Sequence, residues 1–325
     1  MIPASHLLSG FLAGRALRLA SGLPSTKNPL LDPVVLTAIG SSVFPDWDII
    51  PGLVGGIHVS NFHRGPTHSL VGILLQAPLI ALGIHFVWSR YFADTPSLRT
   101  LFWAALAGLA THVFWDSLNP WGVTPFWPWG EKGPGNLMHE GDLYVLGVLI
   151  LSSILVAMKR YRWGFGLGLA FVLSYGLLQF QWGSTIQQRA ERKLGAELVR
   201  TFPNGQVACP WLVLARLADT LQAHCASTPL SAERRLVLEQ PIIQDERIEV
   251  TNAVSEVVRY KDLRDFPFAE LRPHPDGSTT IIWRDLREAV FEIGADQPSG
   301  YYLHLAPDGR VLNGELKWFL RIWFW

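Results

Sequence analysis

The first 183 residues alternate between long apolar runs and short polar stretches. A helix needs about 20 consecutive apolar residues to cross a hydrocarbon core about 30 Å thick. Four runs fit this requirement and predict membrane-spanning helices, at roughly residues 68–88, 100–118, 142–158 and 163–182. Two further runs, 2–20 and 33–44, are shorter or contain arginine, and we expect them to form bundle or interfacial helices.

The pattern changes after about residue 183. Residues 184–202 are charged and amphipathic, which predicts a helix. Residues 268–287 and 301–317 each contain a Pro-Asp-Gly turn, which predicts two β-hairpins. The chain is therefore predicted to be mainly α: an integral-membrane bundle of about four to six helices over residues 1–183, followed by a small extramembrane α+β domain over residues 184–325.

Composition supports a membrane protein with a soluble portion. The 325-residue chain is 49% hydrophobic and only 17% charged, whereas soluble domains are typically about 25% charged. An ordinary cytosolic enzyme is therefore disfavoured. Lysine plus arginine and aspartate plus glutamate number 27 each, so no overall charge favours nucleic acid as a partner, and none is expected.

Basic residues are unequally distributed between the two ends of the expected bundle. If six helices alternate in direction, most basic residues lie at one end: Arg15, Arg18, Lys27, Arg90, Arg99, Lys159, Arg160 and Arg162. The opposite loops contain only Arg64 and Lys132. Basic residues beside membrane spans remain cytoplasmic, so we expect the opposite end and the C-terminal domain to face outside. A disulfide between Cys209 and Cys225 becomes possible there, with two unpaired buried thiols as the alternative.

Polar clusters interrupt the apolar half at positions that alternating helices bring to one end of the bundle. In chain order they are His6, then Asp46 and Asp48, then His63, Arg64 and His68, then His112 and Asp116, and finally His139, Glu140 and Asp142. This convergence follows from helix counting alone.

Each cluster has a structural alternative when it is considered separately. His112 and Asp116 share one helix face and can chelate a divalent ion, or they can simply hydrogen-bond; Asn119 then ends this helix with the following proline. Asp46 follows a proline on a turn, where it can point inward or remain solvated. Asp142 can equally cap the helix that begins after it.

Taken together, the clusters predict a metal site. Four carboxylates at one bundle end repel one another unless a cation lies between them, and ionisable groups at membrane depth are usually functional. Histidine nitrogen with carboxylate oxygen and no thiolate suits zinc first, with manganese or iron as alternatives. Six candidate ligands exceed the needs of one tetrahedral ion, so one or two ions are expected.

These motifs resemble the YdjM/YbcI family of membrane-bound metal-dependent hydrolases. The resemblance covers about residues 1–180 and rests on His6, PDWD at 45–48, HRGPTHS at 63–69, and HxxxD followed by NPWG at 112–122. It implies a protein of the bacterial inner membrane that is distantly similar to zinc-dependent phospholipase C and P1 nuclease. The WRDLR element at 283–287 resembles tails found on some members.

The resemblance and the residues together assign roles at the expected site. The expected metal ligands are His6, Asp46, His68, His112, Asp116 and Asp142, of which the resemblance implies all but Asp142. The expected catalytic residues are Asp48 and His63, as orienting or general-base groups, and Arg64, whose planar fork suits a phosphate.

The expected function is that of a membrane-bound hydrolase. Metal-activated water would cleave a phosphoester or phosphodiester of a lipid or other amphiphilic substrate, so membrane lipids are expected partners. One alternative is a non-catalytic membrane scaffold whose structural metal is closed by four protein ligands. Another is an ion-coupled carrier, which would require broken helices near the midplane and an inverted repeat.

Overall fold

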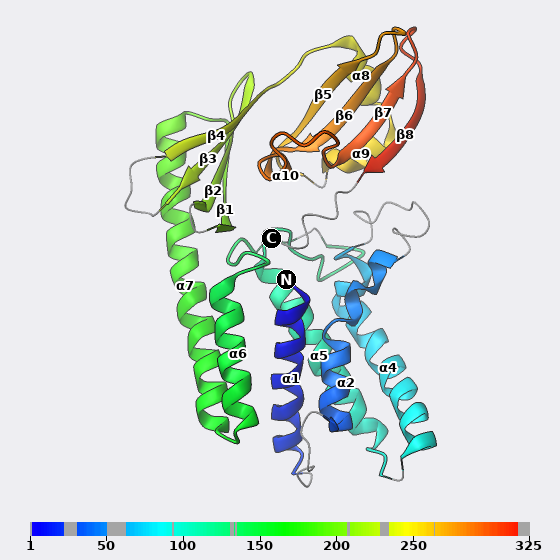
Figure 1. The fold of residues 1–325 in the computed structure, drawn as a ribbon, viewed down its shortest axis with the longest axis vertical. Coiled ribbons are helices and arrows are strands. Elements are labelled where there is room, and N and C mark those ends of the chain that lie inside the picture. The colour runs from blue at the N-terminus through cyan, green and yellow to red at the C-terminus, as the bar shows by residue number, and fades with distance from the viewer. Residues whose placement is uncertain are drawn as a thin grey trace. The chain divides into compact units, whose positions relative to one another are not determined.

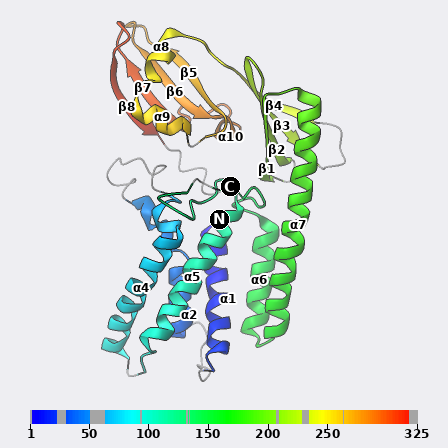
Figure 2. The same cartoon turned by 180° about the vertical axis from the view of Figure 1, so that it is seen from behind.

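The computed structural model describes residues 2–22, 31–50, 63–92, 94–130, 133, 135–206, 209–227, 234–262 and 264–317. Lys27 and Lys132, which enter the charge argument, lie outside these residues. The chain divides into two compact units, Met1–Phe180 and Gln181–Trp325. Figures 1 and 2 show helices in the first and two small sheets in the second.

The first unit is helical. Its elements are α1 (Pro3–Ala20), α2 (Pro33–Ser41), η2 (Phe44–Ile49), η4 (Pro66–His68), α4 (Leu70–Tyr91), α5 (Leu98–Leu118), α6 (Leu143–Ala157) and α7 (Tyr161–Leu194), which continues into the second unit. Helices α1, α2, α4 and α5 run side by side in both views (Figures 1 and 2).

Three of the described helices, α4, α5 and α7, are long and apolar enough to cross a membrane. The fourth predicted span, 142–158, forms the shorter apolar helix α6 of 15 residues. Leucines on α4 and α7 are exposed in the isolated chain; Leu79 is 68% exposed, and Leu169, Leu173 and Leu177 follow one another at four-residue spacing along one face of α7. Surfaces of this kind are typical of contact with lipid.

Glycines allow the short helix α2 to pack closely between α1 and α5. A Cβ added to Gly108 of α5 would lie 2.3 Å from the Ala38 carbonyl oxygen, and one added to Gly10 of α1 would lie 2.8 Å from the same oxygen. At Gly14 the Cβ would lie 2.9 Å from Val35 Cα. Small residues at helix contacts let membrane helices approach each other closely. These contacts fix the end of α2, from which η2 continues.

The charged segment after the last span differs from the prediction in its second half. Helix α7 runs without a break for 34 residues and ends at Leu194, so residues 184–194 extend the preceding span. Gly195 follows with a φ of +57°, the left-handed conformation that commonly ends a helix. Strand β1 (Leu198–Gln206) then replaces the rest of the predicted helix. The β-branched residues Val199 and Thr201 favour a strand here.

The second unit contains two antiparallel four-stranded sheets, each in sequence order. The first sheet comprises β1, β2 (Cys209–Arg216), β3 (Thr220–Ala226) and β4 (Arg234–Pro241). Helices α8 (Glu246–Thr251) and α9 (Ser255–Asp262) follow. The second sheet comprises β5 (Pro267–Pro273), β6 (Thr279–Asp285), β7 (Gly300–Leu305) and β8 (Val311–Lys317), with α10 (Leu286–Ala289) after β6.

Both predicted hairpins are confirmed. Strands β5 and β6 pair across the first Pro-Asp-Gly turn, and β7 and β8 pair across the second. Gly277 and Gly309 in these turns have φ of +84° and +83°, values that favour glycine. The first sheet was not predicted. It contains a disulfide between Cys209 on β2 and Cys225 on β3, whose Cα atoms lie 5.3 Å apart.

The WRDLR element forms buried polar contacts inside the second unit. Arg284 forms ion pairs of 2.5 Å with Glu270 and 2.9 Å with Glu292. The Trp283 indole nitrogen donates to the Thr251 hydroxyl at 3.0 Å. Removing one member of a buried ion pair strongly destabilises a protein, so this element has a structural role in its own unit.

The close contact between α2 and α5 can be tested by enlarging Gly108. Gly108→Ala should lower the free energy of unfolding by about 1–3 kcal/mol, because the added methyl group must push the Ala38 carbonyl away. The matched control is Gly147→Ala on α6, where no atom lies within 4 Å of the added Cβ. Unfolding in detergent, followed by tryptophan fluorescence, measures both variants. Equal stability of the two would contradict the packing argument.

Candidate metal centre

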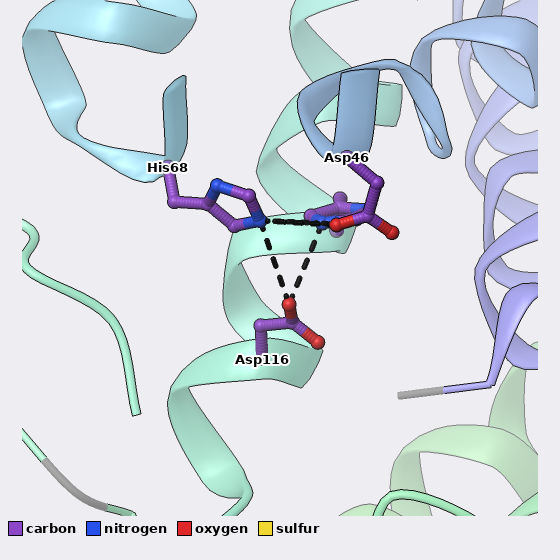
Figure 3. A group of neighbouring side chains, drawn as sticks. Asp46, His68 and Asp116 are labelled. Carbon is purple, nitrogen blue, oxygen red and sulfur yellow. Dashed lines mark hydrogen bonds and ion pairs between the residues drawn. The ribbon is translucent and has the colours of Figure 1, made fainter. Parts of the chain in front are cut away.

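Four side chains that could hold a metal ion come from three separate elements and converge in the first unit. They are Asp46 on η2, His68 at the end of η4, and His112 and Asp116 on α5. One ligand atom of each lies within 4.8 Å of the others. Figure 3 shows Asp46, His68 and Asp116 pointing toward one another. We call these four residues the quartet.

The quartet has the dimensions of a tetrahedral metal site. The two Nε2 atoms of His68 and His112 are 3.0 Å apart, and each lies 3.4 Å from Asp46 Oδ1. Asp116 Oδ2 lies 3.6 Å from the first and 3.5 Å from the second. Bonds of about 2.0–2.1 Å to a tetrahedral zinc ion place neighbouring ligand atoms about 3.3–3.4 Å apart. The residues therefore fit one divalent ion.

Local sequence explains how these elements present their side chains. Prolines occupy the first turns of both short helices, Pro45 in η2 and Pro66 in η4, where a missing N–H is tolerated. The Ser69 hydroxyl then accepts a hydrogen bond from Gly72 N at 2.9 Å and caps α4. His112 and Asp116 are four residues apart on α5, so both face the same side.

Hydrogen bonds outside the quartet orient the two imidazoles. His112 Nδ1 donates to the Ser42 carbonyl at 2.8 Å; since a carbonyl only accepts, Nε2 is left to face the quartet. His68 Nδ1 lies 2.9 Å from the Thr67 hydroxyl, which also bonds to Asp48. Partners of this kind fix the tautomer of metal-binding histidines. Two imidazole nitrogens and two carboxylates facing one another repel unless positive charge lies between them.

Asp46 is the accessible member of the quartet. Its side chain is 22% exposed, whereas those of His68, His112 and Asp116 are at most 1% exposed. Burial raises the pKa of Asp46, but its contacts with His112 and His68 outweigh burial and hold the pKa well below the ordinary range. Asp46 is therefore ionised at neutral pH, and solvent reaches the quartet from its side.

Asp48, His63 and His68 form a second group of potential ligands among the described residues. His63 Nδ1 and Asp48 Oδ1 are 2.8 Å apart, and Asp48 Oδ2 lies 3.6 Å from His68 Nδ1. Burial lowers the pKa of His63, and the hydrogen bond to Asp48 offsets this only in part. Since His68 directs Nε2 into the quartet, Asp48 and His63 lie beside the quartet, on the Nδ1 side of His68. His63 is neutral at pH 7.

His6, an expected ligand, lies beside the quartet. Its ring is fully buried and stacks on His112 with centroids 4.0 Å apart. Its Nε2 lies 3.4 Å from Asp116 Oδ1, whereas the oxygen of Asp116 that faces the quartet is Oδ2. His6 therefore lies against the outer oxygen of Asp116, and neither of its buried ring nitrogens has a hydrogen-bond partner among the described residues.

Asp142, the sixth expected ligand, belongs to neither group found among the described residues. Its carboxylate accepts hydrogen bonds from the backbone N–H groups of Tyr144 and Val145 at 2.9 and 3.1 Å. The Tyr175 hydroxyl donates to its other oxygen at 2.6 Å. Asp142 therefore caps α6, as the alternative interpretation held, and this corrects the prediction that it is a metal ligand.

Arg64 contacts protein acceptors where a substrate phosphate was expected. The residue is 5% exposed, and its φ of +65° is in the left-handed region. Its guanidinium donates to Asn119 Oδ1 at 2.6 Å and to Glu140 Oε1 at 3.0 Å, and lies 3.7 Å from Asp116 Oδ2. A phosphate would have to displace one of these partners. In the structure Arg64 neutralises and positions Asp116.

Sequence reasoning missed the role of Asn119, which it used only as a helix terminator. The Asn119 side chain is fully buried. Its Oδ1 accepts from Arg64 and from the backbone N–H groups of Trp121 and Gly122 at 2.9 and 3.2 Å, and its Nδ2 lies 3.4 Å from Asp116 Oδ1. The available signal was the Asn-Pro-Trp-Gly sequence directly after the HxxxD motif.

The quartet predicts which substitutions remove metal. Elemental mass spectrometry of the purified parent should show about one equivalent of a transition metal. Asp46→Asn, His68→Ala, His112→Ala and Asp116→Asn should each lose it, because each histidine variant removes a ligand atom and each aspartate variant removes the negative charge of a ligand oxygen. Asp142→Asn is the matched control and should keep it, because asparagine also caps helices. Full metal content in His112→Ala would contradict the assignment.

Comparisons with known proteins agree with the membrane-bundle architecture. The chain is 24% identical over 286 residues to the "Uncharacterized protein YfhP" of Bacillus subtilis (strain 168), covering 81% of this chain and 82% of that protein. No solved structure matches the chain. The family model for the YdjM inner membrane protein matches residues 1–185, which include the whole quartet. The chain therefore belongs to the YdjM inner membrane protein family.

Proposed function

We propose that the protein is a membrane-bound, metal-dependent hydrolase that cleaves a phosphoester or phosphodiester of an amphiphilic substrate. The quartet of two imidazole nitrogens and two carboxylate oxygens is the observation that carries this proposal. These four residues would hold a divalent ion, zinc first with manganese or iron as alternatives, which would lower the pKa of a bound water toward about 7.

Ligand chemistry and exposure favour a catalytic site over a closed structural one. Structural zinc sites are mostly built from cysteines, whereas histidine with carboxylate is typical of catalytic sites. The quartet contains no thiolate, and both Asp46 at 22% and His63 at 11% exposure lie where water can reach them. Substrate and water would approach from this side.

His63 is the proposed general base. Its Nδ1 donates to Asp48 at 2.8 Å, and its Nε2, which accepts from Arg64 Nε at 3.4 Å, would exchange this long hydrogen bond for one from the attacking water. Asp48 then stabilises the imidazolium that forms. Arg64 and Asn119 are positioning residues, because their contacts hold Asp116 in place.

The second unit and the metal centre are proposed to face the outer side of the inner membrane. Basic residues occur at the opposite ends of the three candidate spans: Arg90 at the end of α4, Arg99 at the start of α5 and Arg162 at the start of α7. Such residues remain cytoplasmic. The disulfide between Cys209 and Cys225 is independent support, because disulfides persist in oxidising compartments.

A non-catalytic scaffold is the second candidate. Four protein ligands suffice to fill a tetrahedral coordination sphere, as structural sites do. Such a protein would bind metal, lose stability without it, and turn over no phosphodiester.

Replacing His63 separates catalysis from metal binding. His63→Gln should lower kcat on bis(p-nitrophenyl) phosphate by about 10²–10⁴-fold, the usual contribution of a general base, with metal content unchanged. His112→Ala should lose both metal and activity, because His112 is a member of the quartet. Full turnover by metal-free His112→Ala would contradict the hydrolase proposal. A metal-loaded parent without turnover on any phosphodiester would favour the scaffold.

Cysteine labelling tests the proposed orientation. Both native cysteines are joined in the disulfide, so an added cysteine is the reactive one. In intact cells a membrane-impermeant maleimide should label Asp308→Cys in the exposed β7–β8 turn. Arg162→Cys at the start of α7 should react only after permeabilisation. The reverse pattern would overturn the orientation.

A further inference from the structure

Residues 121–130, which follow α5 and Asn119, form a loop that we call the aromatic loop. Its sequence, WGVTPFWPWG, contains no charged residue. Hydrogen bonds anchor its base: Thr124 N donates to the Arg64 carbonyl at 2.9 Å, and Leu70 N donates to the Pro125 carbonyl at 2.9 Å. Val123 is 1% exposed. The base of the loop is therefore tied to the start of α4 and to the residue that positions Asp116.

The tip of the aromatic loop is exposed although its base is fixed. Phe126, Trp127 and Trp129 are 64%, 41% and 85% exposed. Three exposed large aromatic side chains in one loop are unfavourable in water, but they are typical of the membrane–water interface, where one side of the ring meets lipid and the other meets water.

The loop is placed where two candidate spans leave the hydrocarbon. It begins after α5, and its Pro125 carbonyl binds the first residue of α4. Helix α4 has 22 residues and is about 33 Å long, close to the thickness of the hydrocarbon core. Exposed Tyr91 marks its other end, and exposed Trp163 marks the start of α7. Aromatic residues therefore lie at both ends of the spans.

The metal centre is at the same level as the aromatic loop. His68 lies two residues before the start of α4, and Asp116 lies in the last turn of α5. Phe44 and Trp47, on either side of Asp46 in η2, are 42% and 46% exposed. Exposed aromatic side chains thus lie beside Asp46, the solvent-accessible member of the quartet. This is the depth that lipid headgroups occupy in a bilayer.

We propose that the aromatic loop inserts into the headgroup region of the leaflet beside the metal centre, and that the phosphate cleaved there is carried by a lipid of that leaflet. This inference rests on the proposed hydrolase function and specifies its substrate as membrane-borne. The lipid approaches from the Asp46 side, flanked by Phe44 and Trp47, without leaving the membrane.

The reaction needs no reactant besides water. The water oxygen forms a bond to phosphorus, and the ester P–O bond breaks. His63 takes the proton of the attacking water and returns it to the departing alkoxide. The products are an alcohol and a phosphate with one ester bond fewer.

Insertion of the loop is measured without any catalysis. A nitroxide label on Phe126→Cys, in the full chain in nanodiscs of phosphatidylethanolamine and phosphatidylglycerol, should collide readily with oxygen and be shielded from a water-soluble nickel chelate. The same label on Asp308→Cys is the aqueous control, because this side chain lies in an exposed turn. Equal exposure of both labels to the chelate would overturn the insertion.

The substrate class is measured with two probes. Trp127→Ala combined with Trp129→Ala should lower the hydrolysis rate of phosphatidylglycerol in the nanodisc by about tenfold or more. The rate on water-soluble bis(p-nitrophenyl) phosphate and the metal content should not change. Trp163→Ala is the matched control. It removes an aromatic side chain of 72% exposure in the first turn of α7, away from the aromatic loop, and should leave both rates unchanged.

Different failures have different meanings. Turnover of the soluble diester alone, or an equal fall of both rates in the loop variant, would overturn the lipid-borne substrate. Absence of turnover on both probes by the metal-loaded parent would overturn the proposed hydrolase function together with its substrate, and the nitroxide depth would then decide the insertion separately.

Discussion

Two carboxylates gathered inside the apolar bundle are the constraint on which the first unit depends. Asp46 and Asp116 approach the same pair of imidazole nitrogens within 3.4–3.6 Å. Their facing oxygens lie within 4.8 Å of each other, and two carboxylates this close require a balancing cation. Arg64 provides one balancing charge, 3.7 Å from the oxygen of Asp116 that faces the quartet. The geometry of the four ligand atoms suits a second, divalent charge. The two carboxylates, the arginine and the expected ion are thus parts of one electrostatic arrangement.

The helix packing and the chemistry of the centre are connected through α2. Glycines on both neighbouring helices let the backbone of α2 approach closely, which sets the position of the Ser42 carbonyl at its end. That carbonyl holds the Nδ1 proton of His112 and so determines which nitrogen faces the quartet. Close packing of small residues therefore defines a ligand tautomer several residues away, and a shift of α2 would disturb both Asp46 and His112.

Sequence reasoning predicted features that follow from local signals and from helix counting. The convergence of Asp46, His68, His112 and Asp116 follows from alternation of helix direction, and the two hairpins follow from their Pro-Asp-Gly turns. The role of Asp142 was ambiguous, because a residue before a helix is equally a cap or a ligand until its partner Tyr175 is known. The first sheet was missed although each of its strands pairs with its neighbour in the chain. The Asn-Gly sequence at 204–205 is a hairpin signal that was not used, and the start of β1 had been assigned to the predicted helix at 184–202. Apart from the adjacent His63, the hydrogen-bond partners of Arg64 lie far along the chain, at Asn119 and Glu140, and no local pattern reveals them.

The origin of the four ligands in three separate elements has a consequence for how the protein matures. His68 and His112 are 44 positions apart, so an ion that binds both closes a long segment of chain, and binding energy of this kind becomes folding energy. The site is incomplete until α5, which contributes the last two ligands, has been inserted. Metal uptake would then be a late step in biogenesis. Chains synthesised during metal shortage would remain less stably folded and more susceptible to proteolysis.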